Sequence, residues 1–225
     1  MHITITNLLE PQSLQSALAL LPSLIWRDGQ ATAGRVARQI KQNEQADLST
    51  AAGKQLNEVL RTAIQAHPVL RAAARPKRYS KLLVSKTSPG GGYGTHTDNA
   101  LMGTGSARMR SDLSFTLFLS APDQYERGDL VIETAGETRR HRLPAGSLVL
   151  YPSGHLHRVD PVTAGERIVC VGWIESLIRG QEQRDILFDL ENLRADLAEI
   201  VEPQSAQALI LSKSISNLLR LWSQP

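Results

Sequence analysis

The stretch DLSFTLFLSAPDQYERGDLVIE (residues 112–133) decides the fold class. In its first half, apolar residues at 113, 115, 117 and 119 alternate with polar residues at 112, 114, 116 and 120, and only Phe118 interrupts the polar side. A period of two residues is that of a β-strand with one face in a core. Proline, aspartate and glycine then separate it from a second short apolar run, LVIE. The stretch therefore predicts a half-buried strand, a turn and another strand.

Similar short runs continue on both sides of it. From residue 79 to about 178, each of SKLLVSKT, GDLVIET, TRRHRL, GSLVLYPS and ERIVCVGWIESL is about one strand long, and turn-forming residues separate them. Many short strands at this spacing indicate a sandwich, a barrel or a jelly roll.

Helical patterns flank this block. PQSLQSALALL (11–21) starts with proline, and the segment 47–74 is a further helix or a pair interrupted near Pro68. After Arg179, apolar residues recur at 186, 190, 193, 197 and 200, and a second apolar helix follows Pro203. We expect an N-terminal helical region at 1–78, a strand-rich core at 79–179 and a helical extension at 180–225. The last two helices either cover the core or form a dimer seam.

Composition excludes several classes of protein. The 225 residues are 41% hydrophobic and 21% charged with a formal net charge of +3, which is ordinary for a globular chain. Aromatic residues make up only 4%, so we expect no nucleic-acid partner. No apolar run is long enough to span a membrane, and the start lacks the features of a signal peptide. The single cysteine, Cys170, fits the reducing cytoplasm, and its apolar surroundings predict a buried side chain.

A glycine-rich motif, GYGTHTDNALMG (92–103), carries candidate metal ligands. His96 and Asp98 are two residues apart and point to the same side if the segment is extended. HLH at 155–157 offers a third ligand after a strand-rich interval, and Arg167 follows ten residues beyond His157. Two imidazoles and one carboxylate form the facial triad that leaves open positions on Fe(II). Each piece is common by itself, and the order of the pieces favours a metal site over an ordinary polar turn.

These blocks resemble a known family. GYGTHTDNA, residues 108–133 and LPAGSLVLYPSGHLHRVDPVTAGERIVCVGWIESLIR (143–179) are similar to the signature blocks of PKHD-type hydroxylases, which are prolyl-4-hydroxylase-like Fe(II)/2-oxoglutarate-dependent dioxygenases. The resemblance implies an α+β fold with a double-stranded β-helix (jelly roll) core and flanking helices. It also implies a cytoplasmic enzyme that uses Fe(II), 2-oxoglutarate as co-substrate and L-ascorbate. Such an enzyme hydroxylates a small molecule or a peptide and releases succinate and CO2.

The resemblance also implies roles for residues. His96, Asp98 and His157 would bind Fe(II), and Arg167 would pair with the distal carboxylate of 2-oxoglutarate, as a planar guanidinium does well. Tyr93 would hydrogen-bond 2-oxoglutarate, or else pack against the barrel wall. A further tyrosine that the family often has near position 87 is missing. Lys86 and Thr87 are the candidates to replace it, and the sequence leaves open whether either does.

Several alternatives remain open at the level of sequence. His155 competes with His157 as the third ligand, because both lie on one side of an extended HLH segment. His141 is expected to be an exposed strand residue, and His2 and His67 to be structural. The loop 103–112 is either a lid whose Arg108 and Arg110 meet an anionic substrate or a solvated connection.

Two rival functions also fit the residues. One is a sensor that binds iron and 2-oxoglutarate without catalysis. The other is a cupin-like metalloenzyme that uses zinc or manganese without 2-oxoglutarate.

Overall fold

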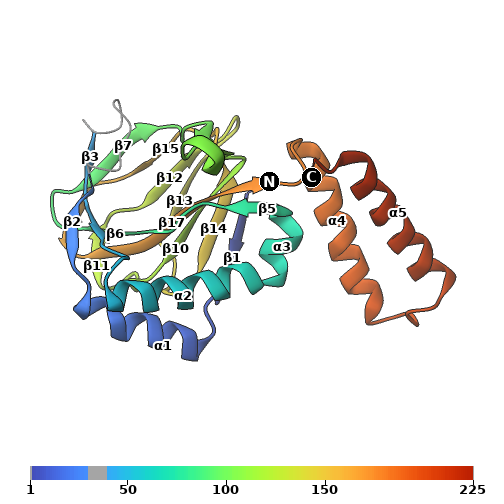
Figure 1. The fold of residues 1–225 in the computed structure, drawn as a ribbon, viewed down its shortest axis with the longest axis horizontal. Helices are drawn as coiled ribbons and strands as arrows, with labels where there is room; N and C mark the ends of the chain where they lie inside the picture. The colour runs from blue at the N-terminus through green and yellow to red at the C-terminus, as the bar shows by residue number, and fades with distance from the viewer. Residues whose placement is uncertain (1, 30–39, 225) are drawn as a thin grey trace.

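The computed structural model describes residues 2–29 and 40–224, and it confirms the predicted α+β jelly roll (Figure 1). Two antiparallel sheets form the core, and we call them the major sheet and the minor sheet. Helices flank this core at both ends of the chain. No helix within the described residues has both the length and the apolar character needed to cross a membrane.

The major sheet has eight strands within the described residues, in the order β1-β14-β10-β17-β6-β4-β2, with β5 also paired to β17. Their bounds are β1 Ile3–Ile5, β14 Leu148–Pro152, β10 Leu113–Phe118, β17 Arg167–Ser176, β6 Leu83–Thr87, β4 Glu44–Ala46, β2 Trp26–Asp28 and β5 Pro76–Tyr79. The long strand β17 lies at its centre, between β10 and β6.

The minor sheet has the order β13-β12-β15-β7-β3. Its strands are β13 Thr138–His141, β12 Leu130–Glu133, β15 His157–Val159, β7 Gly92–His96 and β3 Lys41–Gln42. Two small pairs lie beside the sheets: β11 Tyr125–Arg127 with β16 Val162–Gly165, and β8 Leu101–Met102 with β9 Met109–Arg110.

Helices α1 Pro11–Leu20, α2 Ala51–Ala66 and α3 Pro68–Ala74 pack against the major sheet, and a 3-10 turn, η1 Leu21–Ser23, follows α1. Leu56, Leu60 and Ile64 recur every four residues along α2 and are fully buried, so one stripe of this helix covers the sheet. Thr50 caps α2, because its Oγ1 accepts a hydrogen bond of 3.1 Å from the Gly53 amide. The predicted break at Pro68 is confirmed, since the proline begins α3.

At the other end of the chain, α4 Gln181–Ala198 and α5 Ala206–Trp222 form a hairpin that stands beside the core (Figure 1). A short 3-10 turn, η4 Gly105–Ala107, lies in the loop between β8 and β9.

The structure corrects two expectations about strands. The first 78 residues are not only helical, because β1, β2 and β4 extend the major sheet and β3 extends the minor one. In addition, β10 is not half-buried: all six of its residues are buried. Its apolar side meets the helix-covered core, and its polar side, with Ser114 and Thr116, lines the space between the sheets.

Candidate metal centre and its cavity

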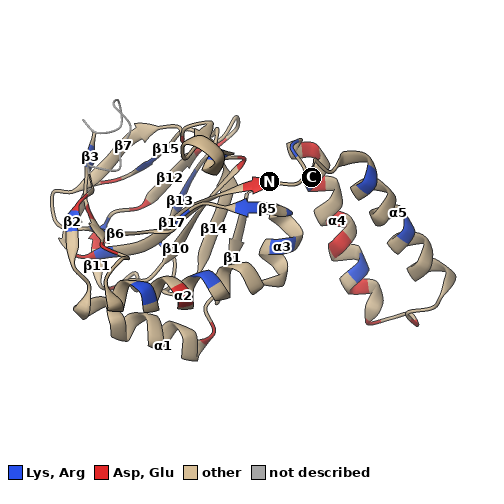
Figure 2. Cartoon of the chain, in the orientation of Figure 1, with Lys and Arg blue, Asp and Glu red and all other residues tan. Residues whose placement is uncertain are grey.

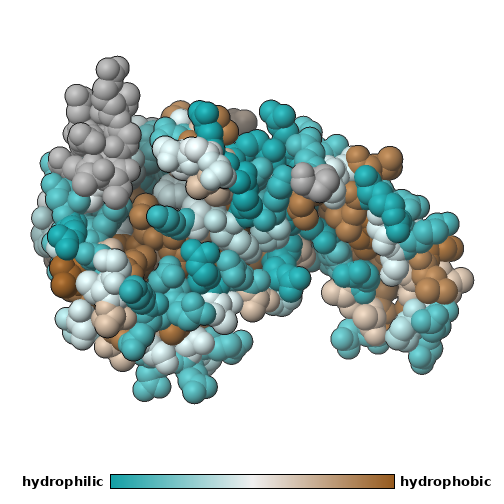
Figure 3. All heavy atoms as spheres, viewed as in Figure 1, coloured by the Kyte–Doolittle hydropathy of each residue, from teal (hydrophilic) through white to brown (hydrophobic). Residues whose placement is uncertain are grey.

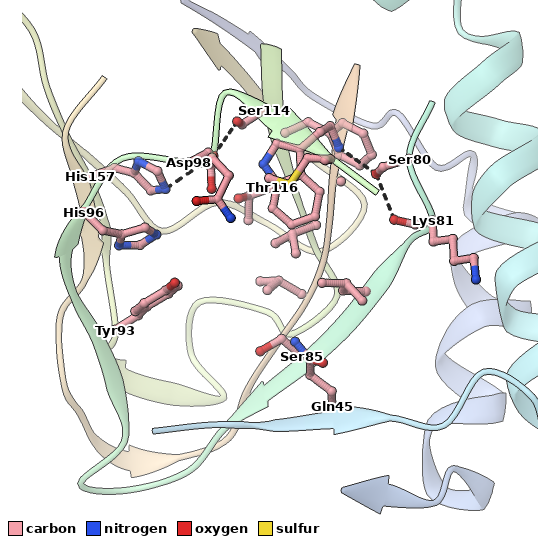
Figure 4. A pocket seen from close by; sticks show the side chains of 18 of the residues that line it. Gln45, Ser80, Lys81, Ser85, Tyr93, His96, Asp98, Ser114, Thr116 and His157 are labelled. Carbon is pink, nitrogen blue, oxygen red and sulfur yellow. Dashed lines mark hydrogen bonds and ion pairs between the residues drawn. The ribbon is translucent and has the colours of Figure 1, made fainter. Parts of the chain in front are cut away.

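A cavity of about 590 Å³ lies between the two sheets. Side chains from both sheets line it, and Figure 4 shows His96, His157 and Asp98 grouped on one wall with Ser85 and Gln45 across from them. Asp98 is the only carboxylate among the described residues that line this cavity. Volume and concavity of this order suit a small ligand together with a bound metal.

Strand register places the two histidines together. His157 of β15 stands directly opposite His96 of β7 in the antiparallel minor sheet. Opposed residues of an antiparallel pair project to the same face about 5 Å apart. The two imidazole centroids are accordingly 4.3 Å apart. His96 and His157 are 61 positions apart in the sequence, and the strand pairing brings their rings into contact.

Both imidazole rings are oriented by the same kind of backbone contact. Nδ1 of His96 lies 2.7 Å from the carbonyl oxygen of Gly94, and Nδ1 of His157 lies 3.0 Å from that of His155. A carbonyl oxygen can only accept, so in each ring Nδ1 carries the proton and donates. In a neutral imidazole with its proton on Nδ1, Nε2 carries the lone pair, which is the form of histidine that binds metals.

Asp98 joins the histidines from the segment after β7. Its Oδ2 lies 3.7 Å from Nε2 of His157 and accepts a hydrogen bond of 2.6 Å from Ser114 Oγ. Its backbone amide donates to the carbonyl oxygen of Ser153 at 3.3 Å. Asp98 is thus held through both its side chain and its backbone, and Ser114 contacts it from the major sheet.

The three side chains form a compact donor set. One ligand atom from each of His96, Asp98 and His157 lies within 4.8 Å of the others, and no other such group occurs in the described chain. Burial, and then the neighbouring His157, lower the pKa of His96 to about 4, so this ring is neutral at physiological pH. Two imidazoles and one carboxylate match the ligands that divalent iron takes in facial triads.

Tyr93 stacks on a proposed metal ligand. Its ring lies 3.7 Å from the His96 ring, centroid to centroid and nearly parallel, and burial raises the pKa of its hydroxyl to about 12. Glycines allow the backbone of this strand to pass close to its neighbours. A Cβ at Gly92 would lie 2.9 Å from the Val159 carbonyl oxygen, and one at Gly94 would lie 3.0 Å from Cβ of Ile40.

Arg167 begins β17 on the opposite wall and is only 2% exposed. Its Nε has no hydrogen-bond partner, and no carboxylate of the described residues lies within ion-pair distance of it. Its guanidinium carbon lies 5.5 Å from the Phe118 ring. Burial lowers the pKa of Arg167, and nearby Tyr125 and Tyr151 partly offset this. A buried cation without an anion costs free energy, so this position fits an anionic ligand.

The two candidates for the missing tyrosine point to opposite sides of β6. Thr87 pairs with Arg167 across the sheet, is 3% exposed and lines the cavity. Lys86 lies on the other side of the strand, where its Nζ is 2.9 Å from Glu44 and 4.8 Å from the Trp26 ring. Only Thr87 is therefore placed to contact a ligand beside Arg167.

The remaining histidines do not join the donor set. His155 precedes β15 and does not line the cavity, although its backbone carbonyl orients His157. His141 is not an exposed strand residue, contrary to expectation: it is half-buried and its ring lies 4.8 Å from that of His2. His67 precedes α3. Cys170 is buried as expected.

The two arginines of the loop 103–112 do not line the cavity. Arg110 bonds Asp112 through Nε at 3.2 Å and the Ser176 carbonyl oxygen through Nη2 at 3.1 Å. Arg108 is exposed and lines no part of the cavity. Of the two alternatives for this loop, the positions of the arginines favour the solvated connection over contact with a substrate in the cavity. Thr104, Ala107 and Met109 of the loop do line the cavity, as does Met102 just before it.

Sequence reasoning missed Ser114 and Tyr125. Ser114 supports Asp98 from 16 residues away, and Tyr125 lies beside Arg167. The polar alternation in β10 was the available signal for Ser114, because a serine on a strand with a fully buried face needs a polar partner.

Comparison with known proteins gives a consistent result. Residues 82–175 match the model of the 2OG-Fe(II) oxygenase superfamily. The chain is 52% identical over 221 residues to a PKHD-type hydroxylase of Hyphomonas neptunium, covering 98% of this chain and 99% of that one. It is 49% identical over 224 residues to a PKHD-type hydroxylase of Synechococcus elongatus, with full coverage of both chains.

Solved structures share the fold at low sequence identity. A prolyl hydroxylase from Trichoplax adhaerens, in complex with a hypoxia inducible factor peptide fragment, is 19% identical and superposes with a TM-score of 0.58 over 83% of this chain and 86% of that one. A prolyl-4-hydroxylase from Pseudomonas putida is 18% identical, with a TM-score of 0.52 over 78% and 92% of the two chains. HygX from Streptomyces hygroscopicus, with nickel, 2-oxoglutarate and hygromycin B bound, is 11% identical, with a TM-score of 0.53 over 79% and 84%.

Proposed function

The chain belongs to the PKHD-type hydroxylases of the 2OG-Fe(II) oxygenase superfamily and is a 2-oxoglutarate-dependent hydroxylase, and on that premise we propose a residue-level account of its site. His96, Asp98 and His157 bind Fe(II), and Arg167 binds 2-oxoglutarate. The observation that carries this proposal is the cavity that joins the metal donor set to Arg167, a buried cation whose Nε has no hydrogen-bond partner.

The metal ligands are prepared by their neighbours. Backbone carbonyls fix the Nδ1 protons of both histidines, so each Nε2 is available without rearrangement. Ser114 donates to Oδ2 of Asp98, the oxygen that lies 3.7 Å from Nε2 of His157, and so orients the carboxylate for the metal. The Tyr93 ring limits rotation of the His96 ring by stacking on it.

The co-substrate is bound by charge and by a hydroxyl. Arg167 donates to the distal carboxylate of 2-oxoglutarate from β17, and Thr87 donates to the same carboxylate from the adjacent position on β6. Phe118 and the two tyrosines near Arg167 exclude water, which strengthens this ion pair. The keto acid end is thereby directed across the cavity toward the three ligands.

Fe(II) with 2-oxoglutarate supplies an oxidation by dioxygen in which 2-oxoglutarate becomes succinate and CO2 and a C–H bond of the substrate becomes C–OH. L-ascorbate serves as the supporting reductant. The prime substrate is a small molecule or a peptide that binds in the same cavity, which Met102 and Trp173 also line. The reaction takes place in the cytoplasm, in keeping with a single buried thiol and a reduced metal.

Anaerobic titration of the full chain tests the account. Fe(II) and 2-oxoglutarate together are expected to give a visible absorption band that neither gives alone, and air is expected to release succinate in proportion to 2-oxoglutarate consumed. Omission of ascorbate should lower the number of turnovers. A panel of metabolites and peptides is then screened for stimulation of succinate release.

Two outcomes would overturn the proposal in different ways. Bound zinc or manganese without any 2-oxoglutarate-dependent band would support the cupin-like enzyme. A band with no succinate under any substrate in the panel would support the sensor. Manganese with 2-oxoglutarate, which is inert to air, serves as the control for binding without turnover.

A further inference from the structure

The hairpin of α4 and α5 is attached to the core by one side only. Arg75, just after α3, forms an ion pair with Glu191 of α4, and Phe188 packs into the core beneath the major sheet. At its base, the Gln224 amide donates to the Leu177 carbonyl oxygen at 2.8 Å. Apart from the pairing of α4 with α5, the extensive contact of the hairpin with another described element is that of α4 with α3 (Figure 1).

The two helices have a small apolar seam of their own. Leu187 of α4 and Ile215 of α5 are buried in it with Ile178, and leucines at 190, 211, 218 and 219 pack against them. This seam holds the hairpin together, so the apolar residues outside it are not needed for pairing of α4 with α5.

A row of large apolar side chains nevertheless remains exposed on the hairpin. The exposed fractions are 46% for Ile186, 46% for Leu193, 78% for Ile200, 60% for Ile210 and 76% for Leu221. We call these five residues the hairpin face. Figure 3 shows apolar side chains gathered on this part of the molecule. A concentration of exposed isoleucine and leucine marks a surface that binds something.

Helix geometry puts Ile186, Leu193, Ile210 and Leu221 on one side of the hairpin, while Ile200 lies in the turn that follows α4. Leu209, which is 49% exposed, falls on the other side of α5. Leu193 and Leu221 each stand three residues after a seam leucine, and Ile186 and Ile210 each stand one residue before one. Two antiparallel helices are related by a local twofold axis perpendicular to the pair, so positions with the same offset from the seam face the same way. On α4 this side is opposite Phe188, which faces the core.

The charges of the two helices are opposite. Helix α4 contains five acidic residues and two arginines, whereas α5 contains Lys213 and Arg220 and no acidic residue. Figure 2 shows this contrast between the two helices. By helical position, Asp189 and Asp196 border the hairpin face on α4, and Lys213 and Arg220 lie at its outer border on α5.

We propose that the hairpin face binds the hairpin face of a second copy of this chain. A twofold axis parallel to the helices places each α4 against the partner's α5, which brings the acidic border of one copy to the basic border of the other. The product is a four-helix bundle with the two cores on its outer sides. The alternative twofold axis would stack α4 on α4, with acidic borders opposed, and charge repulsion disfavours it.

Sedimentation velocity of the full chain between about 1 and 100 µM tests this proposal. Wild type is expected to form a dimer of twice 24.7 kDa. The double variant Ile210→Gln/Leu221→Gln should raise the dimer dissociation constant at least tenfold, because two exposed anchors are lost. The matched control is Ile25→Gln/Val69→Gln, which changes two exposed apolar residues of the core region, 52% and 38% exposed, and should leave the constant unchanged. A monomer throughout, or equal behaviour of the two double variants, would overturn the proposal.

Charge reversal tests the arrangement. Lys213→Glu/Arg220→Glu should weaken the dimer several-fold, and adding Asp189→Lys/Asp196→Lys to the same chain should restore it. Circular dichroism of each variant checks that the helices are intact. In the alternative arrangement α5 stacks on α5, so the first pair would only replace one like-charge border with another. A dimer left unchanged by Lys213→Glu/Arg220→Glu would therefore contradict the proposed arrangement. If the chain is monomeric and binds to anionic lipid vesicles in a flotation assay, the hairpin face would instead be a membrane-binding surface, and the proposal would be wrong.

Discussion

The two sheets contribute to the candidate site in different ways. The minor sheet supplies His96 and His157 from short adjacent strands, and their positions depend on register alone. The major sheet supplies Arg167 and Thr87 from longer strands whose faces are both covered. In the proposed site, side chains of the minor sheet thus bind the metal, and those of the major sheet bind the distal carboxylate of 2-oxoglutarate. Substitutions can test whether this division holds.

The largest effect is expected on the minor-sheet side. His157→Ala or Asp98→Ala removes one of three ligand atoms, so Fe(II) affinity and succinate release should fall by on the order of a thousandfold. His155→Ala is the matched control, because His157 is oriented by the backbone oxygen of residue 155 and not by its ring. Anaerobic iron titration measures both. Loss of iron in His155→Ala with retention in His157→Ala would reverse the ligand assignment.

A smaller effect of another kind is expected at Arg167. Arg167→Ala should raise the apparent KM for 2-oxoglutarate by on the order of a hundredfold, because a buried ion pair is lost. Manganese affinity measured without 2-oxoglutarate should change less than threefold. Arg167→Lys should lie between, since an ammonium group cannot make the two parallel bonds of a guanidinium. Loss of metal binding in Arg167→Ala would show that the major sheet also holds the metal.

The strand-rich core could be predicted because its signals are local. Alternation in residues 112–120 and turn residues between short runs are properties of neighbouring positions, and the strands β6, β10, β12, β13, β14 and β17 follow them. The order of His96, Asp98, His157 and Arg167 was visible for a similar reason, since three of them lie at strand ends and Asp98 follows β7 by two residues. The structure brings all four to one cavity.

Features that depend on distant partners were not predictable in this way. Strands β1 to β4 have two or three residues each, too few to show a period, and they exist because other strands offer them an edge. The buried polar side of β10 depends on the minor sheet facing it. On α4, the apolar stripe predicted the helix, but only tertiary packing decided that Leu187 is buried while Ile186 and Leu193 are exposed.

A weaker effect should separate the two neighbours on β6. Thr87→Val keeps the shape and removes the hydroxyl beside Arg167, so KM for 2-oxoglutarate should rise roughly threefold to tenfold, the value of one hydrogen bond. Lys86→Met changes a side chain that is paired with Glu44 outside the cavity and should leave KM unchanged. The reverse pattern would assign the co-substrate contact to Lys86, whose side chain would then have to lie on the cavity side of β6.

The smallest effect concerns the edges where the two sheets meet. His2, just before β1 of the major sheet, lies against His141 of β13 in the minor sheet, with ring centroids 4.8 Å apart. Burial, and then His141, lower the pKa of His2 to about 4, below the value near 6.5 expected in the unfolded chain. Between these values the unfolded chain binds more protons, so stability is full above pH 6.5 and falls as the pH drops toward 4.

Replacement of this ring should therefore flatten the pH dependence of stability. Between pH 7.5 and pH 4.5, the free energy of unfolding of His2→Phe is expected to fall by about 1 kcal/mol less than that of wild type. This figure is reduced because the ring is only half-buried. Urea unfolding at both pH values measures the difference. Equal losses in the two proteins would mean that the His2 ring titrates normally, and that the contact of the sheet edges does not depend on its neutral form.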